Sequence, residues 1–331
     1  MRIAVVGAGA IGGALGGALA LAGHDVSLVA RGAHLEALQD RGLRLVGPDR
    51  EDVVRVQATD DPAQIGAVDA VLLTVKAHAQ AEAGRMLAPL LGPETPVVAA
   101  QNGVPWWYFH AHGGEYDGRR IEAVDPGGAL SQAIPPHRAI GLVAYIGATV
   151  PEPGVVHVRP EAGLVLGEPG GSDSERLRAI TGALDGAGLN ARTRPDLRVE
   201  IWTKLMGNAT FNPISVLTRA GLGTIASHPG TRAVVAAGMR ELVAVATVLG
   251  AAPTIDIEAR LAITARLGEH KTSTLQDLEA GRTLELDAII GATVELAELT
   301  ETDAPVLRML WALGSLAAGR GHTPACVQAG V

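Results

Sequence analysis

The chain begins with Met1–Gly13, which reads MRIAVVGAGAIGG. A short β-branched run leads into Gly-x-Gly-x-x-Gly, and small residues suited to a closely packed helix follow. In such a pattern Gly7 allows a tight turn, Gly9 admits a pyrophosphate to bare backbone, and Gly12 lets the helix approach the sheet. The stretch predicts a dinucleotide-binding βα unit with its phosphates at the helix N-terminus; a glycine-rich turn without a ligand is the alternative. The predicted cofactor-binding residues here are Gly7, Ala8, Gly9, Ala10, Ile11 and Gly12.

The end of the next predicted strand, Val26–Ala30, indicates which dinucleotide binds. NAD enzymes usually place Asp or Glu here, where the carboxylate accepts a hydrogen bond from the ribose 2′-hydroxyl. Residues 26–33 contain no carboxylate, and Arg31 stands at the strand end. Because a guanidinium can bind a 2′-phosphate through two parallel hydrogen bonds, the sequence favours NADP over NAD. The alternative is that Arg31 is a solvated loop charge.

The composition is that of a soluble, mildly acidic globular protein. The 331 residues are 47% apolar and 19% charged, with a net charge of −8. No basic face is indicated, which argues against nucleic-acid binding, and the apolar runs are too short for a membrane span. A strand starts at the first residues, so we expect no secretory signal. The single cysteine, Cys326, allows no intrachain disulfide and has no metal-ligand spacing around it, so we expect a cytoplasmic protein without a metal.

Strands and helices alternate through the first part of the sequence. Continuous apolar runs at 70–75 and 96–100 predict strands buried on both faces, whereas 43–46 and 53–56 predict edge strands. Further strands are predicted at 140–145, 154–158 and 190–193, with a helix at 174–186. From Leu197 the pattern is helical, with segments at 197–211, 231–250, 255–267 and 283–299 and a last one after Pro305.

This order of elements predicts an α/β fold in which an N-terminal, doubly wound Rossmann-type sheet precedes an all-helical C-terminal domain. The change of pattern at Pro195 places an NADP-binding domain at 1–195 and a helical substrate and catalytic domain at 196–331. Ligands of such sheets bind at the carboxyl ends of the strands, so we expect the active site in the cleft between the domains.

Two residues follow buried strands at the predicted cofactor edge. Lys76 comes after the 70–75 strand, and Asn102 lies in a Gln-Asn-Gly turn after the 96–100 strand. A lysine here can neutralise a phosphate or polarise a carbonyl, and an asparagine amide can donate and accept hydrogen bonds. Each residue taken alone is better explained as an ordinary loop residue.

The stronger signal comes from the first helix of the second domain. Lys204, Asn208 and Asn212 are spaced at i, i+4 and i+8, so they share one helix face. Asparagine is a poor helix former because its side chain competes for the backbone, so two of them aligned with a lysine favour a binding face over a solvated polar stripe. Further along, Glu285 and Asp287 are expected in the first turn of a helix that starts at Thr283, where capping alone could explain them.

Together these motifs resemble the ketopantoate reductases (2-dehydropantoate 2-reductases) from end to end. The resemblance rests on the glycine-rich loop, Arg31, Val75-Lys76-Ala77, Gln101-Asn102-Gly103, Lys204-x3-Asn208-x3-Asn212-Pro213, Ser273-x-Leu275-Gln276-Asp277 and Gly281-Arg282-x-x-Glu285. It implies NADPH-dependent reduction of a small 2-oxo acid, namely ketopantoate to pantoate, a step of pantothenate biosynthesis. A homodimer is a candidate assembly.

The same resemblance implies roles for individual residues. Lys204 would be the general acid, and Glu285 would hold the substrate oxygen and the cofactor side. Asn102, Asn208 and Asn212 would bind polar groups of the substrate, and Ser273 would meet its carboxylate. Lys76 and Asn102 would also contact the cofactor. A lysine suits this chemistry because reduction of a ketone leaves a developing alkoxide that needs a cation and a proton, and burial lowers a lysine's pKa.

The sequence also departs from the family. Pro105–His110 is an aromatic run followed by a loop-rich stretch to Pro136, and Leu222 stands where the family commonly has asparagine. The aromatic run could line a pocket for a bulkier 2-oxo acid, or it could pack beneath the sheet edge or in a dimer contact. Two other functions are alternatives: a β-hydroxyacid dehydrogenase-like enzyme, and a non-catalytic NADP-sensing protein that would need no polar face at 204–212.

Overall fold

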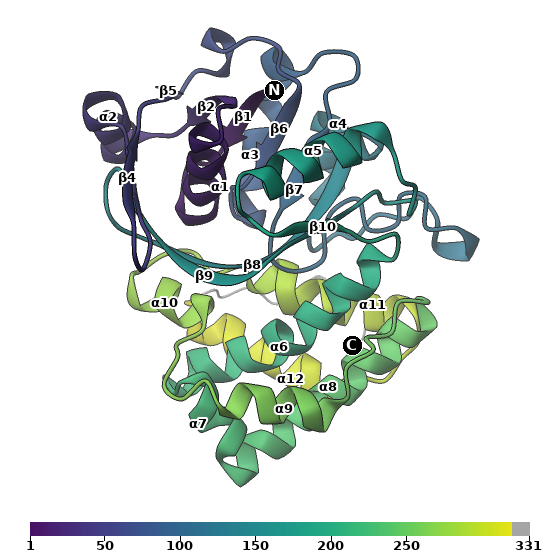
Figure 1. Ribbon diagram of the computed structural model, residues 1–331. Coiled ribbons are helices and arrows are strands. Elements are labelled where there is room, and N and C mark those ends of the chain that lie inside the picture. The colour runs from purple at the N-terminus through teal and green to yellow at the C-terminus, as the bar shows by residue number, and fades with distance from the viewer. Residues whose placement is uncertain (320–331) are drawn as a thin grey trace. The chain divides into compact units, whose positions relative to one another are not determined.

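The computed structural model describes residues 1–319, apart from the side chains of residues 160–162, so Cys326 lies outside the described residues. The chain divides into two compact units (Figure 1). Of the described residues, the first contains Met1–Arg120 and Asp125–Leu197, and the second contains Ile121–Val124 and residues 198–319. The short segment Ile121–Val124 thus belongs to a different unit from the residues that flank it.

One mixed sheet forms the framework of the first unit. Its strand order is β4-β3-β9-β8-β7-β6-β1-β2-β5, with β10 beside β9. The strands are β1 (Arg2–Val6), β2 (Asp25–Val29), β3 (Leu43–Val46), β4 (Glu51–Val54), β5 (Gln57–Thr59), β6 (Ala70–Leu73), β7 (Val97–Ala100), β8 (Ala139–Glu152), β9 (Val155–Gly167) and β10 (Ala191–Thr193). The run from β8 through β7, β6, β1 and β2 to β5 is parallel throughout, which confirms the Rossmann-type core.

The antiparallel part of the sheet differs from the prediction. The strands expected at 140–145 and 154–158 are the two arms of a long hairpin, β8 and β9, which pair antiparallel. The strand at 43–46 is not an edge strand, because β3 pairs with β4 on one side and β9 on the other. The strand that pairs with β3 is β9, the second arm of the hairpin. A pattern of short apolar runs cannot show how far the arms of this hairpin extend.

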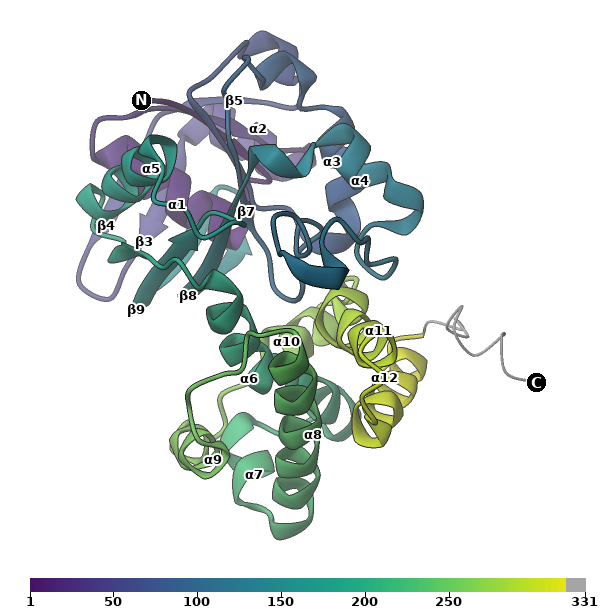
Figure 2. The same ribbon diagram turned by 90° about the vertical axis from the view of Figure 1, so that its right-hand side faces the viewer.

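Helices cover the sheet of the first unit (Figure 2). They are α1 (Ala10–Leu21), α2 (Gly32–Arg41), α3 (Gln80–Arg85), α4 (Ala129–Ala133) and α5 (Glu175–Gly186). Helix α1 approaches the strands closely because it is rich in glycine: a Cβ at Gly17 would lie 2.5 Å from Leu45 Cδ1. Leu15 and Leu19 of α1 share one buried cluster with Leu177 and Ile180 of α5 and with strand residues.

The second unit is helical, as predicted. Its helices are α6 (Leu197–Thr218), α7 (Leu222–Ser227), α8 (Pro229–Val248), α9 (Ile257–Ala265), α10 (Ser273–Glu279), α11 (Ala292–Leu299) and α12 (Pro305–Ala317). The prediction of a helix from Thr283 was wrong, because residues 282–285 are not helical and a π-helical turn at Asp287–Gly291 precedes α11. The Arg282 N–H and side chain both bind Asp277, at 2.8 Å to its carbonyl and 2.8 Å to its carboxylate, which holds this stretch in a loop.

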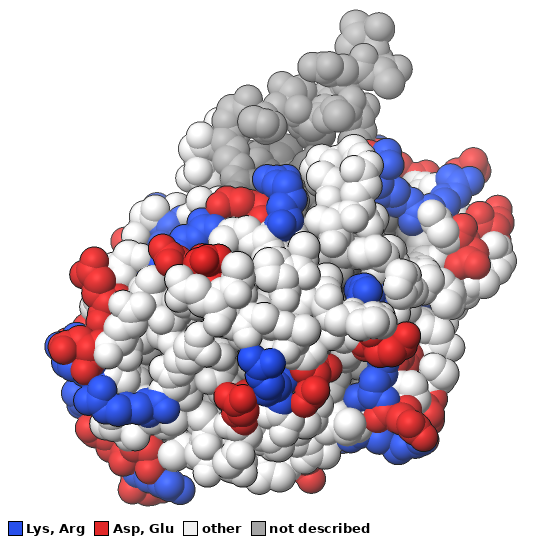
Figure 3. Space-filling model, turned by 90° about the horizontal axis from the view of Figure 1, so that it is seen from above, with Lys and Arg blue, Asp and Glu red and all other residues white. Residues whose placement is uncertain are grey.

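Charges of both signs are interspersed over the face of the molecule in Figure 3. Exposed ion pairs of the first unit include Arg44 with Glu51 and Arg178 with Asp173. Among residues 1–319, no helix combines the length and apolar character that crossing a membrane requires.

Candidate active site

The loop between β1 and α1 is a tight turn in which position 7 requires glycine. Gly7 has a φ of +103°, and a Cβ there would lie 2.6 Å from Val75 Cγ1. The Gly7 and Ala8 N–H groups donate to the Val29 carbonyl at 3.1 and 3.2 Å, which ties the loop to the end of β2. A Cβ at Gly12 would lie only 2.2 Å from the Gly7 carbonyl oxygen. Both glycines therefore act through local packing.

Gly9 differs from its neighbours because space beside it is open. A Cβ built at Gly9 meets no atom within 4 Å. Gly9 is the N-cap of α1 and supplies no side chain to cap it. The first N–H groups of any α-helix lack intrahelical partners, so this end of α1 has the polarity that favours an anion. Ala10 and Ile11 are the first two residues of α1, so their N–H groups lie at this end of the helix.

Thr74 is a part of this loop that the sequence analysis missed. It follows β6, and its hydroxyl donates to the carbonyls of Val6 and Gly7 at 3.2 and 2.7 Å. The same hydroxyl would lie 2.4 Å from a Cβ at Gly12. Thr74 thus braces the turn from the neighbouring strand. The only available signal was a hydroxyl residue near the end of an apolar run.

Arg31 lies two residues beyond β2, at the N-cap of α2. Its Nη1 donates to Glu82 Oε1 at 2.9 Å, and its Nη2 lies 3.2 Å from Met86 Sδ. Lys76 is partly buried after β6 and is the residue just before a short 3-10 turn. Because β1, β2 and β6 are neighbouring parallel strands, the glycine loop, Arg31 and Lys76 lie at one edge of the sheet.

Asn102 extends this edge to the next strand. It is partly buried two residues after β7, which pairs parallel with β6. Gly103 turns the chain with a φ of +92°, and Gln101 Nε2 donates to the Val104 carbonyl at 3.0 Å. This turn fixes where the chain leaves β7, so Asn102 stays at the carboxyl end of the sheet.

The aromatic run that follows Asn102 does not line a pocket, so that interpretation is corrected. Trp106, Trp107, Tyr108 and Phe109 are all at most 3% exposed. Trp106 Nε1 donates to the Ile134 carbonyl at 3.3 Å, and the Tyr108 and Phe109 rings pack edge to face with centroids 5.0 Å apart. These rings are buried core residues, and Trp107 packs against Gly141 of the interior strand β8.

Helix α6 carries the predicted polar face of the second unit. It is continuous from Leu197 to Thr218, so Lys204, Asn208 and Asn212 do share one face. Lys204 and Asn208 are partly buried, and Asn212 is 4% exposed. Within the part of the chain that is described, the buried Nδ2 of Asn212 has no hydrogen-bond partner. An unsatisfied buried amide is costly unless a ligand pairs with it.

Lys204 has the electrostatics of a proton donor. Burial lowers its pKa to about 8, and the carboxylate of Glu285 opposes this shift by favouring the charged form. Glu285 therefore lies within electrostatic reach of Lys204. Its own backbone carbonyl accepts the Ile289 N–H at 3.1 Å, so Glu285 stands just before the π-helical turn rather than inside a helix.

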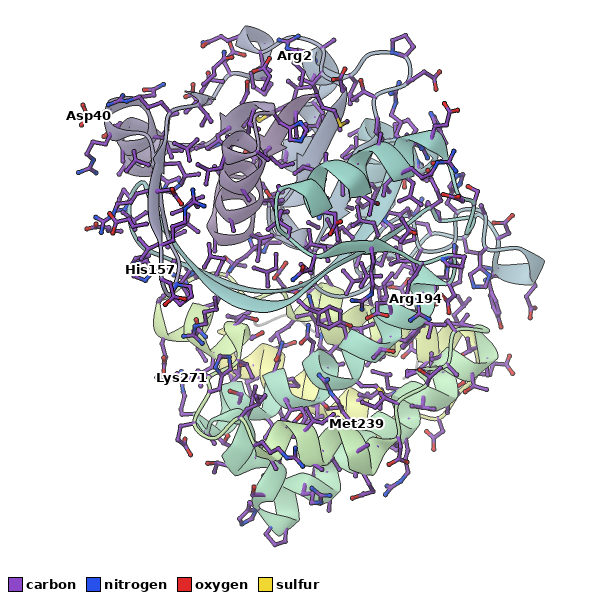
Figure 4. The ribbon with its side chains drawn as sticks, viewed as in Figure 1. Arg2, Asp40, His157, Arg194, Met239 and Lys271 are labelled. Atoms are coloured by element: carbon purple, nitrogen blue, oxygen red, sulfur yellow. The ribbon has the colours of Figure 1, made fainter. Side chains whose placement is uncertain are left out.

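Ser273 is the first residue of α10 and is exposed. The preceding residue, Thr272, caps α10 by accepting the Leu275 N–H at 3.0 Å, and its hydroxyl lies 3.2 Å from Ser215 Oγ. Ser215 is three residues beyond Asn212 on α6, so this contact brings the start of α10 to the polar helix. Lys271, labelled in Figure 4, binds Glu279 and holds the same segment.

Arg260 is a cation near this face that the sequence analysis missed. It comes from α9, and its Nη2 would lie 2.6 Å from a Cβ at Gly207 of α6. Gly207 stands between Lys204 and Asn208 in the sequence. The Arg260 guanidinium therefore packs against the same part of α6 that carries these two residues. A contact between helices separated by some fifty residues leaves no pattern in the sequence.

Comparison with known proteins gives independent evidence about the family. Residues 3–107 match the family Ketopantoate reductase PanE/ApbA, and residues 196–317 match its C-terminal part. A 2-dehydropantoate 2-reductase of Mesorhizobium japonicum is 47% identical over 95% of this chain and 96% of its own length. The crystal structure of a protein from Ralstonia solanacearum MolK2 has a TM-score of 0.90 at 42% identity, covering 97% of this chain and 99% of that one.

A more distant structure shares the fold. A D-mandelate dehydrogenase solved with NADH and anilino(oxo)acetate has a TM-score of 0.81 at 20% identity, covering 96% of this chain and 98% of that one. At this identity the likeness concerns the fold alone. The two matched segments and the 47% identity over nearly the whole length carry the assignment: the chain belongs to the ketopantoate reductase family.

Proposed function

We propose that this protein is an NADPH-dependent 2-dehydropantoate 2-reductase that reduces ketopantoate to pantoate. The observation that carries the proposal is Lys204, whose pKa is lowered to about 8 by burial on a helix face shared with two asparagines. A relative 47% identical over 95% of the chain has this activity in its name. The polar face argues against the alternative of a non-catalytic NADP-sensing protein, which would not need it.

The first unit would hold the cofactor. The backbone of Gly7–Gly12 suits the pyrophosphate, because the space beside Gly9 is open. Arg31 would bind the 2′-phosphate, and Lys76 and Asn102 would contact the cofactor along the same edge of the sheet. NADPH, when bound, supplies the hydride that the keto carbon accepts.

The second unit would supply the proton. As hydride reaches the carbonyl carbon, negative charge develops on the oxygen, and a cation aimed at it stabilises that charge. The Lys204 ammonium would do this and pass one proton from Nζ to the oxygen, which leaves a neutral amine and the 2-hydroxy acid. Glu285 would keep Lys204 charged until the transfer and help to hold the substrate oxygen.

The remaining site residues would orient the substrate. The unsatisfied Nδ2 of Asn212 is suited to a polar group of the acid, as is Asn208 one turn earlier. Ser273 would bind the carboxylate, and Asn102 a further polar group. Ketopantoate is favoured over a bulkier 2-oxo acid because the aromatic residues that would have formed a larger wall are buried in the core.

The test is a steady-state assay of NADPH oxidation with ketopantoate beside 2-oxo acids of larger and smaller side chains. We expect ketopantoate to have the highest kcat/KM, and NADPH to be preferred to NADH. A substrate lacking the hydroxyl group and reduced more efficiently than ketopantoate would contradict the assignment. The homodimer stays a prediction that light scattering in solution would check.

A further inference from the structure

The guanidinium of Arg31 already has a carboxylate partner. Its Nη1 binds Glu82 Oε1 at 2.9 Å, and its Nη2 lies 3.2 Å from the thioether sulfur of Met86. Glu82 is in α3, and Met86 is the residue just after that helix. Four residues apart, the two side chains lie on the same face. Two of the Arg31 guanidinium nitrogens are therefore contacted, one by α3 and the other by the residue that follows it.

We infer that Glu82 is a specificity-determining residue of the cofactor site, because it competes with the 2′-phosphate for Arg31. The inference rests on the proposed function, in which Arg31 binds that phosphate. A dianionic phosphate must either displace the carboxylate or share the guanidinium with it. Either event lowers the affinity for NADPH. The uncharged 2′-hydroxyl of NADH needs no such exchange, so Glu82 reduces the preference for NADPH.

The exposure of the pair sets the size of this effect. The side chains of Arg31 and Glu82 are 61% and 60% exposed. Ion pairs at such positions are weak because water screens them, so the phosphate can win the competition. A carboxylate that remains near a dianion still repels it, by an amount that water also limits. We therefore expect Glu82 to tune the selectivity rather than to block NADPH.

Binding of cofactor fragments tests this inference without catalysis. The probes are 2′,5′-ADP, which carries the 2′-phosphate, and ADP, which does not, measured by isothermal titration calorimetry on the full chain. The Glu82→Gln variant keeps the side-chain shape and removes the charge. It should bind 2′,5′-ADP about three- to tenfold more tightly than the wild type, the range expected for removing an exposed ion pair and a nearby like charge. Its affinity for ADP should not change.

A matched control separates the contact from net charge. Glu36→Gln removes an exposed carboxylate from α2, five residues from Arg31, and should leave the ratio of the two affinities unchanged. The Arg31→Ala variant should lose the preference for 2′,5′-ADP, and in that background Glu82→Gln should have a smaller effect than in the wild type, because only the repulsion between carboxylate and phosphate is left to remove.

Three outcomes would overturn the inference. Weaker binding of 2′,5′-ADP by Glu82→Gln would mean that the carboxylate positions Arg31 instead of competing for it. No change would make Glu82 a bystander, and an equal gain for ADP would indicate a general charge effect. The proposed role of Arg31 is judged separately, because it depends only on whether Arg31→Ala abolishes the preference for 2′,5′-ADP.

Discussion

In the proposed mechanism, Lys204 has to meet two opposing requirements of a proton donor. It must be charged to stabilise the developing alkoxide, and its proton must be easy to lose. Burial lowers its pKa to about 8, and the carboxylate of Glu285 prevents a larger shift. The result is a lysine that is mostly protonated near neutral pH and whose pKa is close to neutrality, the range in which a general acid would be most efficient.

The first prediction concerns the pH dependence of Lys204. Because the protonated form is the donor, kcat for reduction should be constant below the pKa and should fall as the pH rises through about 8. Lys204→Ala should lower kcat by roughly 10²–10⁴-fold, the usual contribution of a general acid, and should abolish this pH dependence. Fluorescence titration should show nearly unchanged NADPH affinity. A variant with wild-type turnover would assign the proton to another group.

The second prediction separates two glycines of the same loop. Gly9→Ala should fold normally, since its φ of −70° suits alanine and its Cβ meets no atom. It should bind NADPH at least about tenfold more weakly, the loss expected for one charge-assisted hydrogen bond. Gly12→Ala should instead lower the melting temperature, because its Cβ would lie 2.2 Å from the Gly7 carbonyl oxygen. Equal melting temperatures for the two variants would refute this division.

The sequence predicted those residues whose signal is local. The glycine spacing predicted the loop, and the i, i+4, i+8 spacing predicted the polar face of α6. Thr74, Glu82 and Arg260 were not predicted, because each acts through a contact with another element. Glu82 and Arg31, for example, are 51 residues apart, and nothing near either residue indicates the other.

At the scale of elements, the aromatic run shows what a sequence pattern leaves open. Its position after Asn102 fitted both a substrate wall and a buried core segment, since large aromatic residues serve in pockets and in cores alike. The structure decides for the core: a Cβ at Gly141 of β8 would lie 2.4 Å from the Trp107 ring and 2.4 Å from Leu197. The absence of a side chain at Gly141 makes room for the indole.

The third prediction follows from this packing. Trp107→Ala should lower the free energy of unfolding by about 3–5 kcal/mol, the usual cost of removing a buried large aromatic side chain. The ratio of kcat/KM values between ketopantoate and a bulkier 2-oxo acid should stay the same. Urea denaturation and the substrate assay measure the two effects. A changed ratio without lost stability would restore the substrate-wall interpretation.

At the scale of the whole molecule, the alternation of strands and helices was enough to predict the fold class. It could not predict that Ile121–Val124 joins the second unit. The reason lies in Glu295 of α11, whose carboxylate accepts the N–H groups of Glu122 and Ala123 at 2.7 and 2.8 Å. These partners are more than 170 residues apart in the chain. Nothing in the sequence around residues 121–124 indicates a contact with Glu295.

The last prediction concerns this attachment. Burial raises the pKa of Glu295, while the two backbone hydrogen bonds oppose the shift by favouring the carboxylate. Glu295→Ala would leave both N–H groups without this acceptor, so it should lower the free energy of unfolding by about 1–3 kcal/mol. Hydrogen exchange at the amides of residues 122 and 123 should become faster.

Glu298 offers a matched control on the same helix. It is exposed and lies 3.9 Å from Arg308 in a long ion pair. Glu298→Ala should therefore change the free energy of unfolding by no more than about 0.5 kcal/mol and leave exchange at residues 122 and 123 unaltered. If both variants behave alike, the two hydrogen bonds of Glu295 do not hold the segment. A difference confined to Glu295→Ala means that the Glu295 carboxylate holds Ile121–Val124 in the helical unit, although the residues on both sides of this segment belong to the first unit.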